Sequence, residues 1–184
     1  VEQGEAPVFS TSARYDALSG AAGTALHLKE LGCDVRLLGV VGTDAIGRRT
    51  RELLRQQKIA DTLVLEDAGQ PTAHRTHLRG QDGPVLCLEH RGHVTPSRSL
   101  SLRLFQCVDA VLPEVDGVLY SDDMMSLGDA DRERLVSAAT SAGCWVYVGS
   151  REKWSRRLDS GARPPNGSVS LSEVAQELQF QHKL

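Results

Sequence analysis

The chain has 184 residues, 40% of them hydrophobic, which is enough for one domain with a buried core. It is too short for two domains of ordinary size. Its formal net charge is -3 and it has no long basic tract, so neither nucleic acid nor an anionic membrane is an expected partner. No apolar run approaches the length of a membrane span, and no signal peptide opens the chain. Its four cysteines form no CxxC pair, and three lie in apolar stretches, so we expect a cytoplasmic protein without structural disulfides.

The first part of the chain alternates helical and extended patterns. Residues Ala21–Leu31 are apolar on most sides and are followed by Gly32, which predicts a buried helix with a glycine cap. Val35–Val41 and Thr62–Leu65 are short apolar runs typical of buried strands. Between them Asp44 is placed to cap a second helix. The side of this helix that faces the core would carry Ile46, Thr50, Leu53, Leu54 and Gln57.

The same alternation returns in the second part. Val115–Tyr120 and Cys144–Val148 are predicted strands, and Asp129–Ala142 between them is a predicted amphipathic helix. The basic cluster Arg151–Arg157 is predicted to be the solvated face of a helix. Strands that alternate with helices indicate a three-layer α/β fold with a mainly parallel sheet and helices on both faces.

One stretch departs from this alternation of strands and helices. Thr72–Leu78 and Val85–Glu89 are strand-like runs on either side of a Gly-Gln-Asp-Gly turn, which predicts a β-hairpin. Pro7–Ser10 is extended in the same way and is expected to join the hairpin. The sequence therefore predicts an α/β core that carries a small separate sheet.

Several segments together resemble the PfkB family of carbohydrate kinases. Three are similar to the N-terminal signature of the family: residues 19–25, 31–32 and 39–47. Three more are similar to the branch that phosphorylates heptose 7-phosphate: residues 71–76, 112–118 and 121–122. Pro165-Asn166 resembles the Pro-Asn element of the family near the nucleotide.

This resemblance implies a ribokinase-like three-layer sandwich with a small β lid. Residues 1–184 would form a single domain that is incomplete at both ends, with lid segments at about 5–16 and 70–91. It implies ATP-dependent phosphoryl transfer to a sugar or sugar phosphate, with ATP and Mg²⁺ as cofactors. Related kinases use the lid to cover the sugar and to dimerise, and so we expect a homodimer through this sheet, since a sheet of few strands is marginal in water.

The site residues that the resemblance implies are of two kinds. The substrate-binding residues would be Gly20, Ala21, Gly23, Arg75, Glu89 and Asp122. For the first three, free N–H groups at a helix N-terminus would hold a phosphate or sugar oxygen, and the alternative is a tight turn of small residues. Arg75 has a guanidinium that suits an anionic substrate, and the alternative for Arg75 and Glu89 is the exposed face of a small sheet. Asn166 would contact the nucleotide.

No catalytic residue is predicted, because the resemblance also shows departures. A substrate-binding aspartate on the family's first strand would precede Val1, and no Gly-Ala-Gly-Asp motif, which supplies the anion hole and the base, occurs. The family's Gly-Gly-x-x-Asn appears as Ser19–Gly23, without its amide, and Asp122–Ser126 lacks the lysine of the corresponding element. We therefore expect no catalysis by this chain alone.

Two other functions stay open. The chain could be a non-catalytic module that keeps the fold for binding or assembly, and a dinucleotide-binding domain rests on analogy of fold alone. No metal ligand is predicted, because Cys87, His90 and His93 form a zinc-like cluster without an evident fourth ligand.

Overall fold

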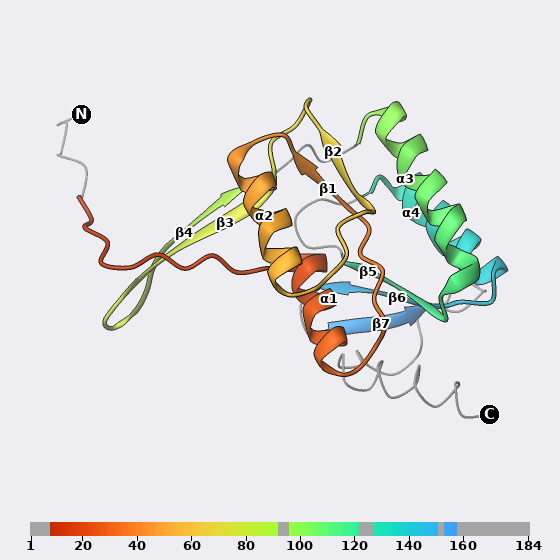
Figure 1. The fold of residues 1–184 in the computed structure, drawn as a ribbon, viewed down its shortest axis with the longest axis horizontal. Coiled ribbons are helices and arrows are strands. Elements are labelled where there is room, and N and C mark those ends of the chain that lie inside the picture. Colours follow the sequence, from red (N-terminus) through yellow and green to blue (C-terminus); the bar gives the residue numbers. More distant parts are fainter. Residues whose placement is uncertain (1–7, 92–95, 122–126, 151–152, 158–184) are drawn as a thin grey trace.

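A computed structural model describes residues 8–91, 96–121, 127–150 and 153–157 of the chain. Its elements, in chain order, are α1 (Gly20–Glu30), β1 (Gly39–Gly42), α2 (Ala45–Gln56), β2 (Val64–Asp67), β3 (His74–Gly80), β4 (Gly83–His90), α3 (Arg98–Val111), a 3-10 turn (Leu112–Glu114), β5 (Gly117–Ser121), α4 (Asp129–Ser141), β6 (Trp145–Ser150) and β7 (Lys153–Arg157). Figure 1 shows α1 and α2 on one side of the strands and α3 and α4 on the other, with the β3–β4 hairpin projecting from the body. The predicted α/β architecture with helices on both faces is confirmed.

The described strands form three separate sheets. Strands β1 and β2 pair in parallel, β5 and β6 pair in parallel, and β3 and β4 form the antiparallel hairpin. In Figure 1 the arrows of β1 and β5 point the same way. The parallel prediction is therefore confirmed for both pairs in the body of the molecule.

Two apolar clusters hold the body together, one for each parallel pair. Helices α1 and α2 pack with β1 and β2 around Leu54, whose side chain is fully buried. Helices α3 and α4 pack with β6 around Ala139 and Val146. The two clusters are linked, because Leu38, next to β1, packs against the second cluster and α1 contacts β5.

The hairpin is fixed to the body at the carboxyl end of β1. Asp44 caps α2 by accepting a hydrogen bond from Gly47 N at 2.7 Å, as its position predicts. The same carboxylate accepts from Thr72 N and from the Thr72 hydroxyl, both at 2.7 Å. The Thr72 hydroxyl in turn accepts from Gly42 N at 2.8 Å. Four hydrogen-bond donors are thus satisfied within this Asp44–Thr72 hydrogen-bond network, which joins β1, α2 and the segment that leads into β3.

Three features of the fold differ from the sequence predictions or were missed. Lys153–Arg157 is strand β7, so the predicted helix is wrong, because the antiparallel edge of β6 offers these residues ladder hydrogen bonds. Residues 8–10 form no strand with the hairpin, so the small sheet has two strands within the described residues. Helix α3 was not predicted, although Leu100, Leu104, Phe105 and Val108 recur on its buried side.

Close packing around the Asp44–Thr72 hydrogen-bond network requires glycine at positions 42 and 47. Substitution of Gly47 tests this requirement. A Cβ on Gly47 would lie 2.1 Å from Gly42 O and 2.9 Å from Thr72 Oγ1. We expect Gly47→Ala to lower the free energy of unfolding by about 3 kcal/mol or more, because backbone must move. In an uncrowded helix the same change would raise the free energy of unfolding by about 1 kcal/mol. The sign of the change in stability therefore distinguishes a crowded position from an uncrowded one. Urea denaturation measures it.

Gly39→Ala is the matched control, because a Cβ there meets nothing within 4 Å. We expect it to leave the urea midpoint close to that of the wild type. A Gly47→Ala protein as stable as the Gly39→Ala protein would contradict the packing argument.

Candidate functional site

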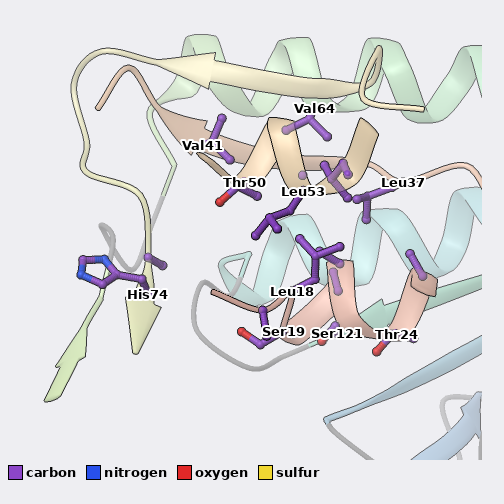
Figure 2. A pocket seen from close by; sticks show the side chains of 18 of the residues that line it. Leu18, Ser19, Thr24, Leu37, Val41, Thr50, Leu53, Val64, His74 and Ser121 are labelled. Carbon is purple, nitrogen blue, oxygen red and sulfur yellow. The ribbon is translucent and has the colours of Figure 1, made fainter. Parts of the chain in front are cut away.

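A cavity of about 2170 Å³ lies between the two parallel strand pairs. Figure 2 shows side chains around it from the α1, β1, α2 and β2 regions of the fold, and Ser121 at the end of β5. Much of the lining is apolar, including Leu37, Val41 and Val64, and polar groups come from Ser19 and Thr50. Sites for small molecules are usually about 300–1,000 Å³ in volume. This space is larger than a small ligand needs, and residues of both apolar clusters line it.

The N-terminus of α1 forms one wall of this cavity. Gly20 and Ala21 line it, whereas Gly23 is not among the lining residues. The Ser19 side chain makes no capping hydrogen bond, and Gly20 has a φ of 56°, a left-handed conformation that glycine adopts without strain. Free N–H groups at such a helix start can bind an anion or a sugar oxygen.

Gly23 has a packing role in the same turn. Its N–H donates to Ser19 O at 3.2 Å, and a Cβ on it would lie 3.2 Å from Leu18 O. Gly20 and Ala21 thus line the cavity and Gly23 does not, and ligand binding by these residues stays a prediction.

Arg75 and Glu89 are brought together on the hairpin. They are register partners, and Arg75 Nε lies 2.5 Å from Glu89 Oε1, while Arg91 Nε lies 2.6 Å from Glu89 Oε2. The hydrogen bonds from Arg91 and Arg75 lower the pKa of Glu89. Arg75 also lines the cavity, whereas Glu89 does not. Without a substrate, the guanidinium predicted to bind an anion is thus neutralised by a carboxylate of the same lid.

Asp44 is the charged group at the point where the hairpin meets the body. Partial burial by itself raises the pKa of Asp44, but hydrogen bonds from Thr72 N, from Gly47 N and from the Thr72 hydroxyl lower it, as does nearby His74. The net pKa is about 2, against an ordinary value of 3.8. This carboxylate is therefore ionised and fully engaged, which makes it a structural anchor and a poor proton acceptor.

The remaining predicted positions have different outcomes. Asp122 and Asn166 lie outside the described residues, as does His93 of the zinc-like cluster. Cys87 and His90 are three residues apart on β4 and so point to opposite faces of the hairpin. The sequence analysis missed the role of Thr72, whose hydroxyl links two elements; the only signal was its position as the first residue of the predicted strand Thr72–Leu78.

Two features of the described residues bear on ligand binding. They are the helix N–H groups at α1 and a guanidinium at the hairpin, both suited to an anionic or hydroxyl-rich ligand.

Comparison with known proteins identifies the family. The model of the pfkB family of carbohydrate kinases matches residues 16–143, which is more than half of the chain. The chain belongs to this family. The matched region includes the α1 N-terminus, the Asp44–Thr72 hydrogen-bond network and the whole hairpin. The resemblance expected from the sequence is confirmed, including its heptose kinase branch, to which two curated relatives point.

The chain is 28% identical over 148 residues to the D-beta-D-heptose 7-phosphate kinase of Bordetella bronchiseptica, covering 77% of this chain and 44% of that protein. It is 35% identical over 63 residues to the bifunctional protein HldE of Hydrogenovibrio crunogenus, covering 34% of this chain and 13% of the relative. This pfkB-family chain therefore spans less than half the length of these curated relatives.

Solved structures agree on the fold. A possible 1-phosphofructokinase from Thermotoga maritima superposes with a TM-score of 0.58 at 18% identity, over 83% of this chain and 49% of that one. The ribokinase of Giardia lamblia superposes with a TM-score of 0.53 at 16% identity, over 84% of this chain and 48% of that one. At these identities the likeness shows the ribokinase-like fold alone.

The lowered pKa of Asp44 predicts a pH dependence of stability. Because the folded pKa of about 2 lies below the ordinary value of 3.8, the stabilisation is fully present above pH 3.8 and is lost as the pH falls towards 2. The pKa difference corresponds to about 2 kcal/mol. We expect Asp44→Asn to destabilise the protein by about that amount at pH 7, and the gap to the wild type to shrink between pH 4 and about pH 2.

Urea denaturation across this pH range measures the gap. Asp34→Asn is the control, because the Asp34 side chain is 83% exposed and makes one long contact, 3.4 Å, to Arg36. It should follow the wild type at every pH. A gap for Asp44→Asn that stays constant down to pH 2 would contradict the assignment.

Proposed function

We propose that this chain is part of a sugar or sugar-phosphate kinase, in which the whole protein transfers a phosphoryl group from ATP to a sugar hydroxyl. The observation that carries the proposal is the uncapped N-terminus of α1 on the wall of the cavity, with Gly20 in a left-handed conformation. Arg75, which lines the same cavity, gives an anionic sugar a second contact. The curated relatives support a sugar phosphate as the substrate class.

We further propose that residues 1–184 alone do not catalyse this transfer. Family membership suggests the use of ATP and Mg²⁺. Among the described residues, however, no three His, Cys, Asp or Glu side chains are grouped to hold a metal ion. Asn166, the predicted nucleotide contact, lies outside them, so these residues support no step through ATP or Mg²⁺.

A non-catalytic assembly module is the second candidate, and the hairpin favours it. Val85, Leu86 and Leu88 are exposed by 51%, 42% and 55%, although they lie on a two-stranded sheet. Exposed apolar side chains and open strand edges favour association. We propose a homodimer through this lid. No helix of the described residues has the length and apolarity needed to cross a bilayer.

The proposal of inactivity predicts no ADP release by the purified chain with ATP, Mg²⁺ and a panel of sugars and sugar phosphates. The physical reason is that the sequence contains no Gly-Ala-Gly-Asp motif, which in the family supplies the anion hole and the base for the sugar hydroxyl. A coupled assay for ADP measures turnover.

Asp122→Ala separates true activity from contamination. Turnover that is the same in the wild type and in Asp122→Ala would come from a contaminant. Turnover in the wild type that disappears in Asp122→Ala would refute the proposed inactivity and would assign Asp122 a role in the site.

The proposed dimer predicts that the mass in solution rises with concentration towards twice that of the chain, and that Leu88→Glu prevents the rise. A carboxylate in place of Leu88 would have to be desolvated at the interface. Light scattering after size-exclusion chromatography measures the mass.

Leu102→Glu is the matched control, because Leu102 on α3 is 53% exposed, close to the 55% of Leu88, and lies away from the hairpin. It should dimerise like the wild type. A wild-type chain that is monomeric at every concentration would reject the dimer.

A further inference from the structure

The hairpin carries a thiol and an imidazole next to each other. His77 of β3 and Cys87 of β4 are register partners, and His77 Nε2 lies 4.0 Å from Cys87 Sγ. Of the four cysteines, Cys87 alone is exposed, and His77 is exposed as well. Thiolate sulfur and imidazole nitrogen are the donor atoms of structural zinc sites.

The spacing of the two donor atoms suits a shared metal ion. Zinc lies about 2.3 Å from a thiolate sulfur and about 2.0–2.1 Å from an imidazole nitrogen, which places two such donors roughly 3.6 Å apart on a tetrahedral ion. Cys87 Sγ and His77 Nε2 are 4.0 Å apart. Small rotations of these two exposed side chains therefore bring both donors onto one ion while the register of the hairpin is kept.

Two donors are half of a closed tetrahedral site. The described part of the chain contains no group of three metal-ligating side chains. Glu89, on the same face of β4 as Cys87, is held by Arg75 and Arg91 and so is occupied. The two missing donors must therefore come from outside the described residues, and a second copy brings the same pair in the same spacing.

We propose that His77 and Cys87 of two copies of this chain bind one Zn²⁺ ion in a tetrahedral Cys₂His₂ site. The ion joins the copies through the face of the hairpin that bears these two residues. Binding displaces the thiol protons to solvent, because zinc is ligated by thiolate.

The rest of this face is suited to contact. Arg75 and Glu89, which lie on this face, neutralise one another. Leu86 and Leu88 lie on the opposite face, so the zinc-linked pair and the association that Leu88→Glu disrupts are separable. The inference stands whether or not the chain is part of a kinase.

The test uses the full chain with a non-thiol reductant and without nucleotide or sugar. Titration with Co²⁺ should give thiolate-to-cobalt charge-transfer bands and the visible bands of a tetrahedral ion, saturating at one ion for two chains. Light scattering should show that Zn²⁺ doubles the mass of Leu88→Glu and that EDTA reverses the change. Cys87→Ser and His77→Ala should each abolish both responses in that background.

His90→Ala is the matched control, because His90 stacks on His74 on the opposite face of the hairpin, with 5.1 Å between ring centroids. It should keep the full metal response. Far-UV circular dichroism establishes that each variant is folded, and Cys87→Ala provides a second removal of the thiol. Absence of tetrahedral bands, saturation at one ion per chain without a change in mass, or a response that survives loss of Cys87 would each overturn the proposal.

Discussion

The carboxylate of Asp44 is the constraint on which the position of the hairpin depends. It accepts hydrogen bonds from the start of α2 and from both polar groups of Thr72, whose hydroxyl reaches back to the end of β1. Such a network leaves no room for a Cβ at Gly42 or Gly47, where backbone atoms would lie 2.5 and 2.1 Å away. The glycines and the acid of the Gly-x-Asp-x-x-Gly segment thus form a single packing unit, and each is required because the others are present.

The cavity is the second determinant of what the chain can do. Residues of both apolar clusters line it, and α1, which belongs to the first cluster, also contacts β5 of the second strand pair. The N-terminus of α1 lies on the cavity wall without a side-chain cap. Apolar side chains such as Val41 and Val64 also lie along the cavity.

The hairpin differs from the body in having no core of its own. Its stability comes from cross-strand pairs, among them the Arg75–Glu89 ion pair and the stacked His74 and His90 rings. The exposed apolar side chains of Val85, Leu86 and Leu88 are left for a partner to cover. Binding of substrate at Arg75 and association of copies would therefore act on one small sheet, and the two are physically connected through it.

The sequence by itself determined the elements whose signals are local. Helical spacing and the N-cap at Asp44 predicted α2, and alternation around a Gly-Gln-Asp-Gly turn predicted the hairpin. Only the tertiary structure decided which side chains meet: Thr72 with Asp44, and Cys87 with His77 rather than with the nearby His90. It also decided that Lys153–Arg157 is a strand, because an open edge of β6 outweighs the charge pattern of those residues. Spacing along the chain fixes the face on which a side chain lies, but register between strands, which depends on distant residues, fixes its neighbour.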